Sequence, residues 1–270
     1  MSQTILTTLG MMIIDEIQYP PSSNKPPITD QIGGAGPYAI IGARVISTIN
    51  HASQISGIID KGAEFPKEVE SEIQNWGTGV IFREDKSRLT TRGVNVYSED
   101  DIRSFYYQTP KKRIVVDDVL EFPKLAESRA YHLICSISRC EEIIDRLNEI
   151  FDKDEEKKMF IFEPLPDDCK HKNLEALKRL LPKINIFTPN LDEARDLLNS
   201  SSEEDVKEIA TRFSEFLQLP NSGTVIRCGP QGCHISTKGG NSFGLPAYHQ
   251  DPANVIDVTG GRIYDGILFK

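Results

Sequence analysis

The 270-residue chain has few of the features that mark disulfide-stabilised, membrane-spanning or nucleic-acid-binding proteins. Its five cysteines are an odd number, which does not suit a framework of disulfides. Acidic side chains outnumber basic ones by 40 to 31, and the net charge of −9 disfavours a surface for nucleic acid or anionic lipid. No apolar run approaches the ~20 residues of a spanning helix, and no basic segment of the signal-peptide kind opens the chain. These absences predict a soluble, cytoplasmic protein.

The cysteines themselves leave two interpretations open. Cys135 and Cys140 are separated by four residues, as are Cys228 and Cys233, and a zinc knuckle just tolerates this spacing. Cys135 and Cys228 each end an apolar run, however, where cysteine is common as a small buried side chain. We expect buried thiols and no tightly bound metal.

Short apolar runs alternate with amphipathic stretches along most of the chain. The predicted strands of this part are residues 131–135, 159–162, 184–187 and 224–227. Apolar side chains at helical spacing lie between them, with predicted helix caps at Ser138 and Ser202. Such alternation predicts an α/β protein with a mainly parallel sheet covered by helices on both faces.

The segment from Thr78 to Thr109 departs from this alternation. It holds three strand-like runs, 80–83, 90–97 and 105–107, with no helix between them. We predict a small, mainly antiparallel sheet inserted into the α/β body, where it covers a ligand site as a lid.

Two motifs near the start of the chain are compatible with ligand binding. The run Gly33-Gly34-Ala35-Gly36 precedes a predicted helix, and bare backbone N–H groups there favour polar or anionic ligands. Asp15 follows an apolar run, and carboxylates in this position often face the ligand crevice. A flexible loop and a solvated side chain are the structural alternatives.

Two further motifs lie in the second half. Asn190 and Glu193 could order a magnesium–water shell near phosphates, or simply form a capping box at a helix start. The sequence Asp257-Val-Thr259-Gly260-Gly261 could form a nest for an anionic transition state, or just a turn.

In this order the motifs resemble those of the pfkB, or ribokinase-like, carbohydrate kinases, and the resemblance spans essentially the whole chain. On the substrate side, it implies that Asp15 binds a sugar and that Gly33 and Gly34 contact the substrate. We predict Arg92 as a further substrate-binding residue on the same side of the cleft as Asp15, because the strand-like runs of the inserted segment predict a sheet that projects over the strand ends. The resemblance also implies a nucleotide and magnesium site, whose residues are Asn190, Glu193, Gly229, Gly232, Asp257 and Thr259. The segments Gly-Ala-Gly-Pro-Tyr, Thr-Thr-Arg-Gly and Phe-Glu-Pro-Leu-Pro are most similar to the fungal maintenance-of-killer branch.

The resemblance implies one ribokinase-like, three-layer α/β/α domain over residues 1–270, with a small β lid from about 15–32 and 78–115. It also implies ATP and Mg²⁺, and a sugar or nucleoside whose hydroxyl accepts a phosphoryl group. Lids in this family can pair two copies, so the resemblance is compatible with a homodimer through the lid, while the sequence does not determine the oligomeric state.

The last motif departs from the family pattern. Gly260 and Gly261 match the anion hole, but Arg262 replaces its second glycine and Ile263 stands at the position of the catalytic aspartate. Isoleucine cannot accept a proton, so a general-base contribution of typically ~10²–10⁴-fold is absent. Asp265 comes two positions too late to replace it. No catalytic residue is therefore intact by this comparison.

Two further departures concern binding. Tyr38 stands where ribokinase-type members often carry asparagine, and the residues after Ile263 are too few for the family's C-terminal helices beside the adenine. We therefore expect weak or absent binding of ATP and Mg²⁺. A working kinase and a kinase-like protein that binds a ligand or partner without turnover both remain open, and the replaced aspartate favours the second.

Overall fold

The computed structural model describes residues 3–99, 103–151 and 157–249. The chain forms two compact units, unit 1 (Met1–Ala126) and unit 2 (Glu127–Lys270), which are described one at a time. No helix within the described residues is long and apolar enough to cross a membrane.

Unit 1 is built around a parallel sheet in the order β1–β4–β5. Its central strand β4 is buried almost throughout, as expected for a strand covered on both faces. Ile40, Val69 and Ile73 of the flanking helices pack into one core cluster with Ile55 and Ile59 of that strand. The elements of unit 1 are β1 (Leu6–Thr8), β2 (Ile13–Gln18), β3 (Ile28–Gly33), α1 (Ala35–Ile46), β4 (Ile55–Lys61), α2 (Lys67–Asn75), β5 (Ile81–Glu84), β6 (Arg92–Tyr97), β7 (Arg103–Tyr107), α3 (Val116–Leu120) and α4 (Pro123–Ala126).

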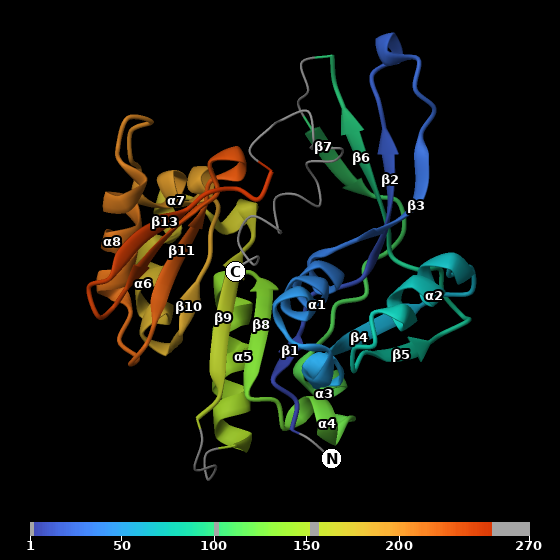
Figure 1. Ribbon diagram of the computed structural model, residues 1–270, viewed down its shortest axis with the longest axis horizontal. Helices are drawn as coiled ribbons and strands as arrows, with labels where there is room; N and C mark the ends of the chain where they lie inside the picture. Colours follow the sequence, from blue (N-terminus) through green and yellow to red (C-terminus); the bar gives the residue numbers. More distant parts are fainter. Residues whose placement is uncertain (1–2, 100–102, 152–156, 250–270) are drawn as a thin grey trace. The chain divides into compact units, whose positions relative to one another are not determined.

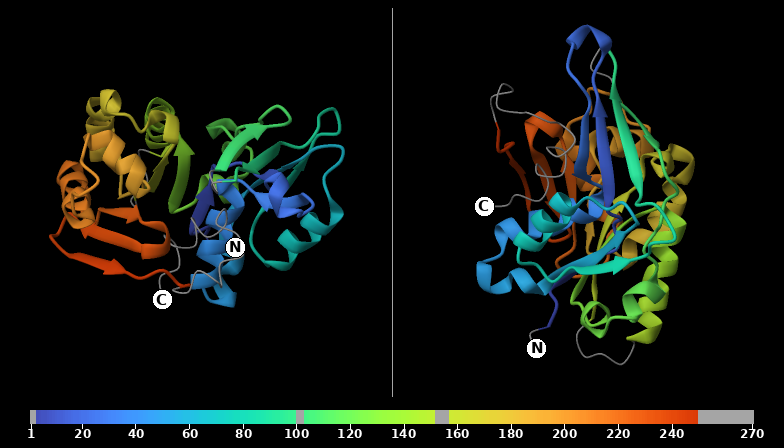
Figure 2. Two further views of the ribbon diagram at one scale, coloured as in Figure 1. Left: turned by 90° about the horizontal axis from the view of Figure 1, so that it is seen from above. Right: turned by 90° about the vertical axis from the view of Figure 1, so that its right-hand side faces the viewer.

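Four strands of unit 1 form a second sheet, which we call the small sheet, in the order β3–β2–β6–β7 (Figures 1 and 2). Strands β2 and β6 are parallel, while β3 and β7 pair antiparallel at its two edges. The inserted sheet is thus present, but one expected strand is not part of it. Residues 81–84 form β5, which pairs with β4, because Phe82 packs on the core cluster of the parallel sheet.

Unit 2 continues the α/β pattern (Figure 1). Strands β8, β9, β10 and β11 are parallel neighbours, and β12 and β13 extend them as antiparallel hairpins. The four strands expected from the sequence are confirmed, although β10 is shorter than the run that predicted it. The elements of unit 2 are β8 (Ala130–Cys135), α5 (Ile137–Ile150), β9 (Met159–Pro164), α6 (Leu174–Leu180), β10 (Ile186–Phe187), α7 (Leu191–Leu198), α8 (Val206–Phe216), β11 (Gly223–Arg227), β12 (Cys233–Thr237) and β13 (Ser242–Leu245).

Two predicted helix caps are wrong by a few residues. Helix α5 is capped by Ser136, whose side chain accepts a hydrogen bond from the Arg139 amide, and not by Ser138. Helix α8 is capped by Asp205, which accepts from the Lys207 amide, and not by Ser202. Serine and aspartate are about equally favourable N-caps, so the residue type alone did not decide which of the nearby candidates begins each helix.

Four of the cysteines, Cys135, Cys140, Cys169 and Cys233, are buried free thiols, as expected. Cys228 is half-buried, and burial raises the pKa of its thiol to about 11. Such a thiol stays protonated at neutral pH and is a poor nucleophile.

Candidate functional site

Asp15 lies in the middle of β2, in the small sheet, and not at the end of a strand as the sequence suggested. It is 6% exposed and is aligned with Gly93 on β6. A β-carbon on Gly33 would lie 2.1 Å from Asp15 Oδ2, and one on Gly93 would lie 3.1 Å from Asp15 Oδ1. The missing side chain of Gly33 therefore leaves the space that this carboxylate occupies, whereas the space over Gly93 is taken by the Phe105 ring, 2.5 Å from a β-carbon there.

The other glycines of the N-terminal motif serve the backbone. Gly34 precedes α1 with a φ of +83°, a conformation that other residues rarely adopt. A β-carbon on Gly36 would lie 2.2 Å from the carbonyl oxygen of Gly10, so the start of α1 packs directly on the chain that leads into β2. Gly33 reaches Asp15 through the antiparallel pairing of β2 and β3, which aligns Gly33 with Ile13, two residues before Asp15.

Arg92 does not share a face with Asp15, which corrects the expectation from the sequence. It is aligned with Ile14, and neighbouring residues of a strand point to opposite faces. Its Nη1 lies 2.9 Å from Asp30 Oδ1 and its Nε lies 3.1 Å from Glu64 Oε1. Burial alone would lower the pKa of Arg92, but these two carboxylates raise it. Arg92 is thus held by two ion pairs on the face of the small sheet opposite to Asp15.

The face that carries Asp15 includes three side chains that the sequence analysis missed. Asn95 follows Gly93 by two residues and so points the same way, and Phe105 and Tyr107 of β7 are aligned with Asn95 and Gly93. We call these three side chains together with Asp15 the Asp15 face. Because alternate residues of a strand face the same side of a sheet, the sequence could have placed Asn95 on the same face as Gly93.

Asn95 and the two aromatic rings have distinct chemical properties. Asn95 is 1% exposed, and its Nδ2 has no hydrogen-bond partner within residues 3–99, 103–151 and 157–249. The rings of Phe105 and Tyr107 meet edge to face at 4.9 Å, and both are more than one third exposed. Burial, and then the Asp15 carboxylate, raise the pKa of Tyr107. A carboxylate, a free amide donor and exposed rings suit a ligand with hydroxyl groups and an apolar face.

Tyr38, the departure from the asparagine of ribokinase-type members, lies in the first turns of α1. Its hydroxyl donates a hydrogen bond of 3.0 Å to the carbonyl oxygen of Ile32 on β3. The tyrosine therefore links the helix to the edge strand that leads into Gly33.

In unit 2, Asn190 and Glu193 form the capping box of α7, which confirms the structural interpretation of this motif. Asn190 Oδ1 accepts from the Glu193 amide at 2.8 Å, and Glu193 Oε2 accepts from the Asn190 amide at 2.8 Å. Glu193 is 8% exposed.

A buried cluster of charges lies beside that capping box. Arg227, the last residue of β11, places Nη1 2.7 Å from Glu163 Oε1 and Nη2 3.8 Å from Glu193 Oε2. On its other side, Glu163 Oε2 lies 3.3 Å from His132 Nε2. We call Arg227, Glu163, Glu193 and His132 the Arg227 cluster. Burial alone would raise the pKa of Glu163, but Arg227 and His132 lower it.

The hairpin after Arg227 contains both glycines of the nucleotide-side motif. Gly232 has a φ of +84°, and its β-carbon would lie 2.0 Å from the carbonyl oxygen of Leu245, so the fold requires glycine there. Gly229 has a φ of +55°, and a β-carbon on it would meet no atom within 4 Å. Open space therefore remains at the tip of the hairpin.

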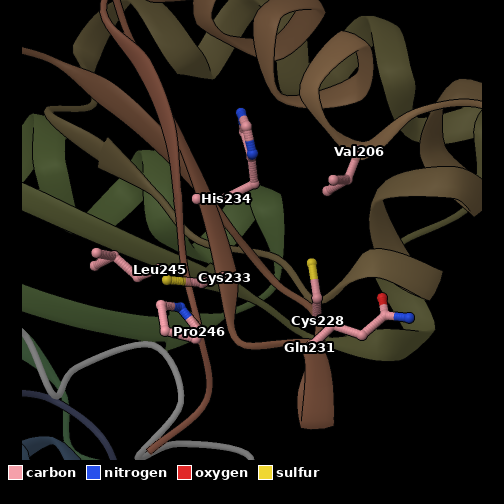
Figure 3. A pocket seen from close by; sticks show the side chains of 8 residues that line it. Val206, Cys228, Gln231, Cys233, His234, Leu245 and Pro246 are labelled. Atoms are coloured by element: carbon pink, nitrogen blue, oxygen red, sulfur yellow. The ribbon is translucent and has the colours of Figure 1, made fainter.

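A cavity of about 260 Å³ lies next to this hairpin. Figure 3 shows the side chains of Cys228 and His234 projecting toward the space beside Val206, at the start of α8. Burial lowers the pKa of His234, so its ring is neutral at neutral pH.

Comparison with known proteins decides the family. The pfkB carbohydrate kinase family matches residues 63–261. The chain is 38% identical over 279 residues to protein MAK32 of Saccharomyces cerevisiae, with 96% of this chain and 76% of that protein covered. The chain belongs to the pfkB family of carbohydrate kinases. The similarity to a maintenance-of-killer protein that the sequence segments suggested is confirmed.

The fold of this pfkB-family chain is ribokinase-like. An adenosine kinase from Anopheles gambiae matches 98% of the chain and 88% of its own length with a TM-score of 0.71 at 15% identity. A ribokinase from Giardia lamblia matches 93% of the chain and 78% of its own length with a TM-score of 0.69 at 16% identity. These structures confirm the predicted α/β fold.

The last pfkB motif lies outside the described residues. This applies to every member that the sequence analysis singled out, namely Asp257, Thr259, Gly260, Gly261, Arg262, Ile263 and Asp265. Their roles stay predictions from the sequence.

The family resemblance implies a magnesium ion. The described residues do not fit direct coordination of that ion by protein side chains. Within the part of the chain that the structure describes, no group of three or more His, Cys, Asp or Glu side chains could hold a metal ion. Glu163 and Glu193 both have the Arg227 guanidinium as a cationic neighbour. Asn190 and Glu193 are engaged with the start of α7.

Proposed function

We propose that this chain is a pfkB-type, carbohydrate kinase-like protein that binds a sugar or nucleoside at the Asp15 face. The observation that carries this proposal is the pairing of Asp15 with Gly33, whose missing side chain makes room for its carboxylate. A carboxylate accepts up to four hydrogen bonds, and sugar hydroxyls are donors that it can accept from.

Each member of the Asp15 face has a role in this proposal. Asp15 accepts hydrogen bonds from ligand hydroxyls, and the Nδ2 group of Asn95 donates one to a hydroxyl oxygen. The half-exposed rings of Phe105 and Tyr107 pack on the apolar side of a sugar or on a base. Arg92 is outside this group, so the ligand does not depend on it for a positive charge.

We further propose that phosphoryl transfer from ATP is impaired. Transfer in this family relies on positioning and charge stabilisation, with a carboxylate that takes the proton of the acceptor hydroxyl. Ile263 stands where that carboxylate is expected, and Arg262 replaces a glycine whose bare amide would meet the phosphate. Arg262 can still attract phosphoryl charge, so the missing proton acceptor is the more serious loss.

The second candidate function is a ligand-binding protein without turnover, which acts through the ligand or a protein partner. The same residue, Ile263, favours it. The two candidates agree on the Asp15 face and differ only in whether ATP is consumed.

The test is calorimetric titration of the full chain with pentoses, hexoses and nucleosides. Asp15→Asn should weaken binding by about tenfold or more, since it removes a charged acceptor from the ligand's hydrogen bonds. Glu16→Gln is the matched control, because Glu16 points to the opposite face of β2 and bonds Gln18. Equal losses in the two variants, or no binding in this panel, would contradict the proposal.

A further inference from the structure

Three consecutive cations follow shortly after β7, and the middle one has a different partner from the other two. Lys112 Nζ lies 3.6 Å from Asp60 Oδ1. Lys111 Nζ lies over the Tyr107 ring, 4.5 Å from its centroid. Burial raises the pKa of the Tyr107 hydroxyl and Arg113 lowers it, so the Arg113 guanidinium is within electrostatic reach of the same ring. Lys111 and Arg113 therefore border the Asp15 face.

These two cations lack a carboxylate partner. The side chains of Lys111 and Arg113 are exposed, and neither forms an ion pair with any residue that the structure describes. By contrast, Arg83, Arg92 and Lys112 of the same unit each pair with a carboxylate. Two neighbouring cations without a counter-ion create a positive potential that attracts an anionic group of a ligand.

The dimensions of the Asp15 face suit a ligand that reaches from the carboxylate to these cations. Asp15 is aligned with Gly93, and Gly93 with Tyr107, so the Asp15 and Tyr107 Cα atoms are two strand spacings, or about 10 Å, apart. The Phe105 ring lies between them, over Gly93. A sugar ring packed on Phe105 can direct hydroxyls at one end to Asp15 and a substituent at its other end to the two cations.

Resting on the function proposed for the Asp15 face, we propose that its ligand is an anionic sugar whose carboxylate or phosphate group binds Lys111 and Arg113. An ammonium and a guanidinium form charge-assisted hydrogen bonds with either group, and such bonds are stronger than those to a neutral hydroxyl. The structural alternative is that the two cations pack on Tyr107 and do not discriminate between ligands.

The test is calorimetric titration of the full chain with neutral sugars and their anionic derivatives. Glucose, galactose, fructose and ribose are compared with their terminal phosphate esters, and glucose and galactose also with their uronic acids. At least one derivative should bind about tenfold more tightly than its parent sugar, and should displace that sugar from the chain. The uronic acids and the phosphate esters then show which of the two anionic groups is accepted.

Two variants separate recognition by these cations from general attraction to the chain. The double variant Lys111→Met and Arg113→Met keeps the apolar length of both side chains and should abolish the preference for the anionic derivative. Lys112→Met is the matched control, because it removes the same charge from the adjacent position, where the side chain faces Asp60, and it should retain the preference. In the native chain, raising the salt concentration from about 0.02 M to about 0.5 M should reduce the preference, since exposed charges are screened.

The possible failures are distinguishable. If neutral sugars bind and no derivative binds more tightly, the anionic ligand is ruled out while the function proposed for the Asp15 face stands. A preference that survives in the double variant, or that Lys112→Met removes equally, also rules out recognition by Lys111 and Arg113. If no sugar or derivative binds, both proposals fail.

Discussion

The carboxylate of Asp15 occupies the space that a side chain at position 33 would need. A β-carbon on Gly33 would lie 2.1 Å from Asp15 Oδ2, nearer than two such atoms can approach. Gly33 and Asp15 therefore depend on each other in the fold, although they are 18 residues apart in the sequence and lie on two different strands, β3 and β2.

Gly33→Ala should displace the Asp15 carboxylate and disturb β2. Overpacking of this kind costs about 1–3 kcal/mol, which chemical denaturation will detect, and ligand binding at the Asp15 face should weaken with it. Gly239→Ala is the control, because its β-carbon would meet only Thr237 Oγ1, at 3.8 Å. That variant should stay within about 0.5 kcal/mol of the native chain. Similar stability of the two variants would contradict the packing argument.

Asn95→Leu should separate binding from stability. The buried Nδ2 of Asn95 lacks a partner among the described residues, so an apolar side chain of similar size should stabilise the free protein by about 1 kcal/mol. The same change should weaken sugar or nucleoside binding, because a hydrogen-bond donor is lost. Thermal unfolding with and without ligand measures both effects, and a destabilised variant with normal affinity would contradict the assignment.

Arg92→Met should affect stability more than binding. The variant loses partly exposed ion pairs with Asp30 and Glu64, which are worth about 1 kcal/mol or less each. Because Arg92 points away from the Asp15 face, the dissociation constant of the ligand should change little. Glu64→Gln should behave in the same way. A large loss of ligand affinity in Arg92→Met, but not in Glu64→Gln, would show that Arg92 contacts the ligand.

Glu163 should make unit 2 sensitive to acid. The pKa of Glu163 in the folded chain lies below its unfolded value of about 4.3. Between these two pKa values, the folded state therefore binds fewer protons than the unfolded state. The resulting stability is present above the unfolded pKa and is lost as pH falls through the folded pKa. Urea unfolding between about pH 3 and pH 6 should give a shallower pH dependence for Glu163→Gln than for the native chain.

Glu175→Gln is the control for that measurement. Glu175 pairs with Lys178 on the surface, where ion pairs contribute little. This variant should keep the pH dependence of the native chain. The interpretation of the Arg227 cluster fails if Glu163→Gln also keeps it.

Local patterns predicted the elements of unit 2 and the capping box of α7, because both depend on residues a few positions apart. The failures have a common cause in contacts between distant segments. The place of Asp15 within a strand, the opposite orientation of Arg92 and the assignment of residues 81–84 to β5 all follow from strand register. Register is set by which strands pair, and no short motif records it.

The Arg227 cluster shows the same limit. In the sequence, Arg227 is the last residue of the predicted strand 224–227 and Glu163 lies in the segment Phe-Glu-Pro-Leu-Pro, and neither pattern predicts contact between the two. Their ion pair joins β9 and β11, which are not adjacent in the sequence. Asn95 differs, because its place on the Asp15 face follows from simple alternation after Gly93.

We expect the chain to bind a sugar or nucleoside without efficient phosphoryl transfer. The most direct measurement is ATP consumption by the purified chain with Mg²⁺ and each ligand that binds in the calorimeter. We expect no ligand-dependent consumption of ATP above background, and a higher rate of consumption for the double variant Ile263→Asp and Arg262→Gly. Robust turnover by the unmodified chain would contradict it and make Asp265 the first residue to replace.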